Sequence, residues 1–473
     1  MPQIVSTPLP GGASPASGEP RAVSADVIAA VLPGPGRDRL AAGPVLAVTT
    51  GQQPGLFTGP LYTIHKALSA IALAQRLEAE RRTPVVPVFW VAGDDHDFAE
   101  ANHTWVLDAA GKAARIVLRE RPADAPLLPL YREPCGSDAA AALAALSAAL
   151  PDTEFKAETV QWLGDAYAAG TNLADACATA INVLLGARGL AVFRAYDRAA
   201  KRAAAATILR GLGATLEDDL TPVLVEGRAG RDRLRAERDG AFVTRRSGER
   251  FPRADLERIA VHEPERLSPN VLLRPAVEAA LFPTVAYAAG PGEIEYFPDA
   301  AALAGRLGLQ TPPSVARWSG LVVESRVAKV LEKHGLTPAD LNGTTGALEA
   351  RIVREALPRE VADLLTALRT QIETDYARLG AAVERIDPTL ERTAQSARNA
   401  ALAGTHDVEK KLLASLKRTN ATLVGQLARA RAALAPEGKP QERVYTVASL
   451  LARYGRGVLD DIAAEVARGV APS

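Results

Sequence analysis

An acidic cluster around one histidine offers the clearest catalytic chemistry in this sequence. Asp94, Asp95, His96 and Asp97 follow one another directly. A histidine beside carboxylates can take a proton from an amine or a hydroxyl, and the nearby negative charge should raise the proton affinity of the imidazole. We therefore predict that His96 is a general base oriented by Asp95 or Asp97. Asp94 is expected to contact the substrate.

The same cluster has two other interpretations. With Glu100 and His103 it offers mixed oxygen and nitrogen ligands, which suit Mg²⁺, Mn²⁺ or Zn²⁺. It could also be the capped and solvated first turn of a helix without function. We favour catalysis or substrate binding because the cluster follows a strongly apolar strand and contains a histidine. We assign no metal ligands and leave open whether a divalent metal is needed.

A glycine-rich loop at residues 51–60 is the second candidate site. It stands between a predicted strand and a predicted helix, where free backbone N–H groups can bind a phosphate or another anion. It matches neither the P-loop nor the Rossmann dinucleotide fingerprint, so a tight connection with a solvated His65 is the alternative. The residues expected to bind the ligand are Gly51, Gln52, Gln53, Thr58, Gly59, Tyr62, His65 and Lys66.

A third cluster of polar residues lies later in the chain. Arg274 offers two parallel N–H donors to a carboxylate or a phosphate, although it could simply pair with a glutamate. Glu293 and Glu295 follow a second glycine turn, and we expect them on one face of a strand. Arg317 is a weaker candidate for a phosphate contact. The residues assigned to binding in this cluster are Asn270, Arg274, Gly290, Gly292 and Glu293.

Alternating strands and helices must position these residues. Apolar runs at 45–50, 85–92 and 189–194 are typical of buried strands, and the segments between them include helices with a 3.6-residue period. This alternation predicts an α/β fold with a parallel sheet covered on both faces. Because open α/β sheets bind ligands at the carboxyl ends of their strands, the glycine loop and the acidic cluster should open onto one cavity.

Shorter elements are expected around this sheet. Residues 104–107 and 114–118 should form a strand pair, and residues 241–251 a hairpin within an insertion at about 213–265. One helical segment is expected over residues 159–187. Residues 1–43 should be flexible, with one short helix at about 25–32.

From about residue 346 the pattern changes to long helices. Apolar residues recur in steps of three and four, as in an antiparallel coiled coil. Pro388 should kink or cap the first helix, and residues 404–407 should form the tip of the hairpin. The predicted organisation is therefore a core at 44–345, an arm at 346–435, and a segment at 436–473 that docks on the core.

The composition limits the classes of function. The chain has 473 residues with 55 basic and 55 acidic side chains, so its formal net charge of zero gives no support for nucleic-acid or anionic membrane binding. No signal peptide or membrane-spanning run is apparent. The two cysteines, Cys135 and Cys177, cannot form a disulfide framework. We expect them to be buried, in a cytoplasmic protein.

Several motifs together resemble the cysteine-adding enzymes of bacillithiol biosynthesis, the BshC cysteine ligase family. The sequence differs from the family pattern in three ways: Asp94 stands where glutamate is expected, Pro54 where alanine is expected, and the segment before Val45 is short. The matching segments are residues 50–53, 55–66, 87–90, 93–98, 267–275, 283–287, 290–294 and 441–444.

The resemblance implies a Rossmann-like, nucleotidyltransferase-type core with inserted connective segments and a coiled-coil arm that forms a homodimer. It also implies addition of L-cysteine to glucosaminyl-malate. A carboxylate and an amine do not condense unaided in water, so we expect ATP to activate the cysteine carboxylate as an acyl adenylate or acyl phosphate. Two alternatives remain: a nucleotidyl or other group transferase acting on another sugar or acid, and a non-catalytic protein that recruits partners through the coiled coil.

Overall fold

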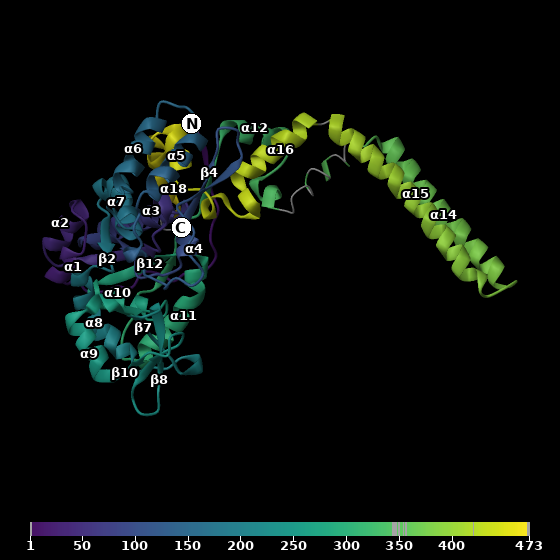
Figure 1. Ribbon diagram of the computed structural model, residues 1–473. Helices are drawn as coiled ribbons and strands as arrows, with labels where there is room; N and C mark the ends of the chain where they lie inside the picture. Colours follow the sequence, from purple (N-terminus) through teal and green to yellow (C-terminus); the bar gives the residue numbers. More distant parts are fainter. Residues whose placement is uncertain are drawn as a thin grey trace. The chain divides into compact units, whose positions relative to one another are not determined.

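The computed structural model describes residues 2–342, 348, 351–352, 354, 357–419 and 421–470. The chain divides into two compact units, which are described separately. Unit 1 contains residues 1–323 and 441–473, and unit 2 contains residues 324–440. The helices and strands of both units are labelled in Figure 1.

A five-stranded parallel sheet forms the centre of unit 1, with the strand order β13-β12-β2-β3-β6. Strands β2 and β3 are buried along nearly their whole length because apolar side chains point toward both faces. The predicted α/β fold with a parallel sheet is confirmed. The strands are β2 (Leu46–Gln52), β3 (Val85–Val91), β6 (Ala191–Arg194), β12 (Thr284–Ala289) and β13 (Ser314–Ala316).

The strand order places a topological switch beside β2. This strand is the first of the sheet in the sequence, with β3 and β6 on one side of it and β12 and β13 on the other. In Rossmann-like sheets, ligands bind in the crevice at the carboxyl ends of the strands where the order reverses. In this chain that position lies between β2 and β12.

Helices cover both faces of the sheet, as predicted. Val86, Val88 and Trp90 pack in one hydrophobic cluster, and Phe89 and Val91 in another, because successive strand side chains point to opposite faces. The first cluster includes side chains from α1 (Ala25–Ala29), α2 (Pro35–Ala41), α8 (Arg198–Gly211), α9 (Arg253–His262) and α10 (Arg274–Leu281). The second includes side chains from α3 (Tyr62–Arg81), α5 (Asp138–Ala149), α6 (Lys156–Ala166), α7 (Leu173–Leu185), α17 (Ala448–Tyr454) and α18 (Gly457–Val470).

The smaller elements of unit 1 confirm some predictions and correct others. The expected strand pair exists as β4 (His103–Leu107) and β5 (Ala113–Val117). The single helix predicted over 159–187 is wrong, because α6 ends at Ala166 and Asn172 caps α7 separately. The first 43 residues contain more structure than one helix: α1, α2, and β1 (Gln3–Ser6), which pairs with β14 (Gly320–Val323). Cys135 and Cys177 are both buried, as expected.

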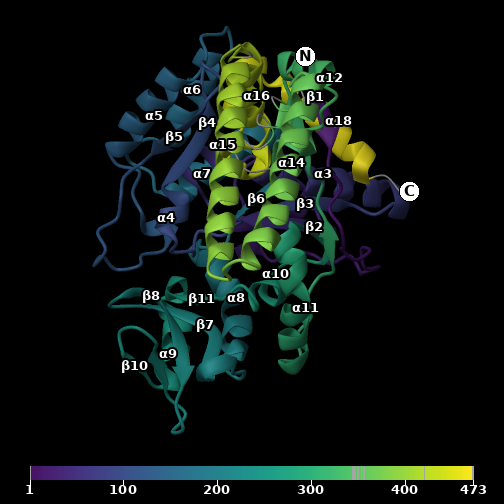
Figure 2. The same cartoon turned by 90° about the vertical axis from the view of Figure 1, so that its right-hand side faces the viewer.

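A second, antiparallel sheet includes the region predicted as an insertion, in the order β10-β9-β8-β7-β11. Figure 2 shows it beside α8 and α9. The predicted hairpin is confirmed as β9 and β10. The two longest strands, β7 and β8, were not predicted. On β8, charged side chains hide the alternating pattern. The strands are β7 (Leu220–Gly227), β8 (Gly230–Ala236), β9 (Phe242–Thr244), β10 (Arg250–Phe251) and β11 (Leu267–Pro269).

The second glycine turn begins a helix rather than a strand. Gly290 is the N-cap of α11 (Pro291–Arg306). The prediction that Glu293 and Glu295 share one face of a strand is therefore wrong, because side chains two residues apart do not face each other on a helix. Glu293 instead turns back and accepts a hydrogen bond from the backbone N–H of Gly290 at 2.8 Å.

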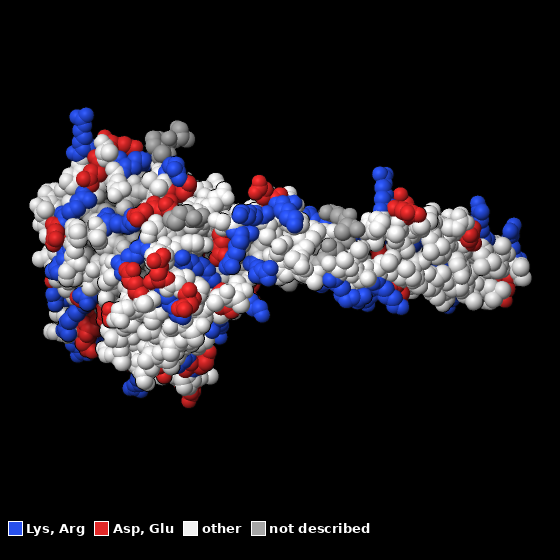
Figure 3. Space-filling view, turned by 90° about the horizontal axis from the view of Figure 1, so that it is seen from above, with Lys and Arg blue, Asp and Glu red and all other residues white. Residues whose placement is uncertain are grey.

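Unit 2 contains two long helices that run side by side in opposite directions, which confirms the coiled-coil arm (Figures 1 and 2). Large parts of the arm surface in Figure 3 carry no charged side chain. None of the described helices in the chain is long and apolar enough to cross a bilayer. The helices of unit 2 are α12 (Ser325–Lys333), α14 (Arg359–Glu384), α15 (Leu390–Thr419) and α16 (Ala421–Leu434).

The tip of the helical hairpin lies at Pro388, not at residues 404–407. Those four residues lie inside α15, so their assignment as the tip is wrong. Glycine costs only about 1 kcal/mol relative to alanine within a helix, whereas proline removes a hydrogen bond and ends it. Asp387 stabilises the turn by accepting a hydrogen bond from the Thr389 N–H at 2.8 Å. The predicted start of the arm near residue 346 lies outside the described residues.

Candidate active site

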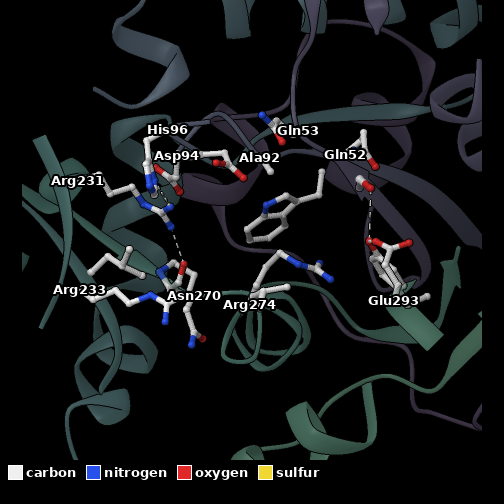
Figure 4. A pocket seen from close by; sticks show the side chains of 17 residues that line it. Gln52, Gln53, Ala92, Asp94, His96, Arg231, Arg233, Asn270, Arg274 and Glu293 are labelled. Carbon is white, nitrogen blue, oxygen red and sulfur yellow. Dashed lines mark hydrogen bonds between the residues drawn. The ribbon is translucent and has the colours of Figure 1, made fainter. Parts of the chain in front are cut away.

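A cavity of about 360 Å³ opens at the carboxyl ends of β2, β3 and β12, beside the topological switch point (Figure 4). Residues of β8 and β11 in the second sheet also line it. The predicted site residues that line the cavity are Gly51, Gln52, Gln53, Asp94, Asp95, His96, Asn270, Arg274 and Glu293. Those that do not are Asp97, Thr58, Gly59, Tyr62, His65, Lys66, Gly290 and Gly292.

His96 faces Arg231, a residue of β8 that the sequence did not suggest. The Arg231 guanidinium lies 3.2 Å from Nδ1 of His96. Because arginine can only donate, Nδ1 accepts this hydrogen bond, and the proton of the neutral imidazole is on Nε2. Burial and the charge of Arg231 lower the pKa of His96, although Asp95 and Asp97 act in the opposite direction. The predicted rise in the proton affinity of His96 is therefore wrong.

The three aspartates of the acidic cluster have different surroundings. Asp94 is buried and pairs with the ammonium group of Lys201 on α8. Asp97 is exposed and caps α4 (Phe98–Ala101), where its carboxylate accepts a hydrogen bond from the Glu100 N–H at 3.0 Å. Asp95 lines the cavity and accepts a hydrogen bond from the Asp97 N–H at 3.0 Å. For Asp97 the structure thus shows the helix cap that was the alternative interpretation.

Tight packing holds the acidic cluster in place. A Cβ atom on Gly93 would lie 2.3 Å from the Tyr196 ring, so only glycine fits where the loop leaves β3. On the other side, Arg121 donates to the carbonyl of His96 at 3.1 Å and lies over the ring of Phe98. The loop therefore presents Asp94, Asp95 and His96 from a fixed backbone.

The glycine loop does not form the predicted anion site. Three of its N–H groups are occupied: Thr58 donates to the Tyr167 hydroxyl at 2.8 Å, Gly59 to the Leu56 carbonyl at 3.0 Å, and Leu61 to the Tyr445 carbonyl at 2.7 Å. Three successive residues, 57–59, have positive φ angles of 50°, 74° and 68°. This strained backbone is buried and held by other parts of unit 1, so it connects β2 to α3 without facing the cavity.

Lys66 does not line the cavity, but it contacts three residues that do. Its ammonium group donates to the Gly51 carbonyl at 2.7 Å and to the Gln52 side chain at 3.0 Å, and it pairs with Glu293 at 2.7 Å. Burial lowers the pKa of Lys66. Burial alone would raise the pKa of Glu293, but Lys66 and Arg274 lower it overall. Lys66 thus fixes Gln52 and Glu293, and it neutralises the Glu293 charge.

His65 neither faces the cavity nor contacts solvent, so both expectations for it are wrong. It is fully buried, and its Nδ1 lies 2.7 Å from the Glu442 carboxylate. Glu442 also accepts two hydrogen bonds from Arg317, at 2.7 and 2.8 Å. Nε2 of His65 has no partner among the described residues, as expected for a neutral imidazole that donates from Nδ1. Arg317 is therefore a structural partner of Glu442 rather than a phosphate contact.

Arg274 combines both of its expected roles. It lines the cavity, yet it also pairs with the buried Glu278 at 2.7 Å and lies over the Tyr287 ring. Asn270 caps the start of this segment by accepting hydrogen bonds from the N–H groups of residues 272 and 273.

The sequence interpretation missed Arg231, Arg233 and Lys201. The first two line the cavity from one face of β8. The available signal is the alternation of Arg231, Arg233 and Arg235 with residues 232 and 234, but the many charges in this segment hide the strand pattern. Among the residues that the structure describes, no group of three or more His, Cys, Asp or Glu side chains could hold a metal ion.

Comparison with known proteins identifies the family. The family model described as "Bacillithiol biosynthesis BshC, N-terminal Rossmann-like domain" matches residues 37–221 and 222–318, and the one described as "Bacillithiol biosynthesis BshC, C-terminal coiled-coil domain" matches residues 320–468. The chain belongs to the BshC family. A BshC relative from Salinibacter ruber is 34% identical over 456 residues, covering 88% of this chain and 80% of the relative. One from Chlorobaculum tepidum is 32% identical over 468 residues with the same coverage. Both are named "Putative cysteine ligase BshC".

Proposed function

We propose that the chain is a ligase that joins L-cysteine to glucosaminyl-malate through an amide bond, in the last step of bacillithiol biosynthesis. Membership of the BshC family supports ligase chemistry on cysteine. The observation that carries the proposal is the cavity at the switch point, which brings a histidine, carboxylates and three arginines together in a Rossmann-like core. This set can bind a substrate with both acidic and amino groups. As a biosynthetic enzyme, the protein would act in the cytoplasm.

Activation of the cysteine carboxylate is the chemical requirement of this reaction. ATP would supply that activation when bound. Its phosphates do not fit the glycine loop, because the N–H groups of Thr58, Gly59 and Leu61 are already occupied. Arg274 lines the cavity, and its guanidinium could hold a phosphate or the cysteine carboxylate.

His96 is proposed to take the proton from the sugar amine. Its lowered pKa keeps the imidazole neutral near pH 7, as a base requires. The nitrogen that could accept the proton, Nδ1, bonds to Arg231 in this structure. The base therefore becomes available when Arg231 turns from His96 to an anionic group of the substrate.

The test is synthesis of bacillithiol by the purified enzyme from cysteine, glucosaminyl-malate and ATP, followed by mass spectrometry. His96→Ala should lower turnover by about 10²–10⁴-fold, the usual contribution of a general base. The control is His262→Ala, because His262 is exposed at the end of α9 and does not line the cavity. Near-normal turnover of His96→Ala would exclude His96 as the base. Product formation without a nucleotide would remove the ATP step.

A further inference from the structure

The charges around the cavity are balanced at one end and unbalanced at the other. Near β2 and β12, Glu293 pairs with Lys66 at 2.7 Å and Arg274 with Glu278 at 2.7 Å. In the acidic cluster, Asp94 pairs with the buried Lys201. Each of these three pairs is neutral overall.

Three charged groups of the lining form no close ion pair among the described residues: Asp95, Arg231 and Arg233. Asp94 and Asp95 act on Arg231 only from a longer distance. Arg231 is partly buried and donates only to neutral acceptors, namely the Ser268 hydroxyl at 2.8 Å, the Pro269 carbonyl at 3.0 Å and His96. Burial of this guanidinium is offset only in part by the carboxylates of Asp94 and Asp95, because the pKa of Arg231 is lowered overall. Such an arrangement is expected where a ligand supplies the negative charge.

Arg231 and Arg233 extend from the same face of one strand. Arg231 and Arg233 are two residues apart on β8, so their side chains lie on one face with Cα atoms about 6.6 Å apart. In Figure 4 both lie at the same side of the cavity as His96 and Asp94, while Gln52 and Glu293 lie at the other. A pair of guanidinium groups at this spacing suits a short dicarboxylate, with one carboxylate for each arginine.

We infer that the Arg231–Arg233 face of the cavity binds the dicarboxylate part of the acceptor substrate, and that Asp95 binds its amine. This inference rests on the proposed function for the choice of glucosaminyl-malate. That molecule carries two carboxylates on the malyl group and its amine on the sugar carbon next to the glycosidic carbon. Two cations and one anion side by side match this pattern. Binding would also draw Arg231 away from His96 and free Nδ1 beside the amine.

The test measures binding without catalysis, by calorimetric titration with L-malate, L-lactate and glucosaminyl-malate. Arg233→Gln should weaken binding of L-malate and glucosaminyl-malate by about tenfold to 100-fold, the value of a hydrogen bond to a charged group. Binding of the monocarboxylate L-lactate should be weak and nearly unchanged. The matched control is Arg235→Gln, on the same face of β8 but outside the cavity, where Arg235 pairs with Glu237. Its titrations should equal those of the unmodified enzyme.

Asp95→Asn tests the contact with the amine independently of the contacts with the two carboxylates. It should weaken binding of glucosaminyl-malate but not that of L-malate, which has no amine. Arg231→Lys should weaken both, and a thermal melt shows whether this variant is folded. Arg233 is exposed, so Arg233→Gln tests the inference even if Arg231→Lys does not fold.

Two results would overturn the inference. One is unchanged L-malate affinity in Arg233→Gln. The other is a higher KM for ATP in that variant with an unchanged KM for glucosaminyl-malate, which would assign these arginines to phosphate. Arginine-dependent L-malate binding in an enzyme that makes no bacillithiol would instead refute the proposed function and leave a dicarboxylate site. Bacillithiol synthesis that is insensitive to both arginines would refute the site and leave the ligase.

Discussion

Burial and the neighbouring Arg231 together favour the neutral form of His96. Burial and the adjacent guanidinium lower the pKa of His96 below its ordinary value of about 6.5. A base works in its neutral form, above its pKa, so the acidic limb of kcat/KM should lie below pH 6.5. Arg231→Gln removes a positive charge and should move that limb to higher pH. The measurement is kcat/KM from about pH 5 to pH 8, the range in which histidine titrates.

The position of this limb distinguishes an electrostatic role for Arg231 from simple substrate binding. Loss of substrate contacts would lower kcat/KM at every pH without moving the limb. Arg235→Gln should leave both the limb and the value unchanged, because Arg235 does not line the cavity. A limb that stays in place in Arg231→Gln would refute control of His96 by Arg231.

Residue types and local spacing were enough to find part of this site. His96, Asp94, Asp95 and Arg274 stand in motifs whose chemistry is visible in the sequence, and all four line the cavity. Arg231 could not be found in this way, because it lies 135 residues from His96 and a strand hidden among charged residues brings it there. Burial and this contact lower the pKa of His96, and neither is visible in the local sequence, so the direction of the shift was predicted wrongly.

At the level of elements, the segment at 441–443 links α3 to other parts of unit 1 through the hydrogen bonds and ion pairs of Glu442. Glu442 accepts hydrogen bonds from His65 on α3, from Arg317, and from Ser319 at 2.9 Å. Glu442→Gln should destabilise the protein by about 3–5 kcal/mol, because it leaves the buried Arg317 without a counter-charge. Equilibrium unfolding in urea measures this change.

A matched control for this prediction is Glu465→Gln, which removes an ion pair to Arg468 on the surface of α18. It should change the free energy of unfolding by no more than about 1 kcal/mol. The ion pairs and hydrogen bonds of Glu442 lower its pKa despite burial, so its contribution to stability is present at neutral pH. It should be lost as the pH falls below about 4.3, where the unfolded carboxylate takes up a proton. Equal stability of both glutamine variants at pH 7 would contradict this role.

The elements that could be predicted are those whose pattern is long and apolar. Strands β2 and β3 are nearly continuous apolar runs, and α3 carries a clear helical period. The three-residue alternation at 293–295 was too short to distinguish a strand from the first turn of α11. Gly404 suggested a turn, but it lies inside α15, and the turn is at Pro388. A sequence alone does not show that packing against the neighbouring helix allows a glycine within α15.

For the whole molecule, a sequence does not specify which strands that are distant in the chain become neighbours in the sheet. Thr284 of β12 pairs beside Ala47 of β2, and this pairing creates the switch point on which the cavity depends. Local periodicity predicts a parallel sheet but not its order. The family resemblance supplied the Rossmann-like core that local patterns could not specify.

The arm carries apolar side chains that the single chain leaves exposed. On α14, Leu364, Leu368 and Leu379 are 63, 50 and 48% exposed, at spacings of four and eleven residues that keep them on one stripe. Ile386, seven residues further on in the turn after α14, is 82% exposed. We propose that this stripe packs against a second copy of the chain. The double variant Leu364→Glu/Leu368→Glu should convert a dimer into a monomer, because it places carboxylates in an apolar contact.

Sedimentation equilibrium measures this change in mass, and bacillithiol synthesis measures its effect on function. All residues that line the cavity belong to unit 1 of one chain, so the monomeric variant should keep most of its activity. Val261→Glu is the matched control, because Val261 is 66% exposed on α9 in unit 1. It should not change the mass. A monomeric unmodified protein, or a double variant that stays dimeric, would show that this stripe does not join two chains.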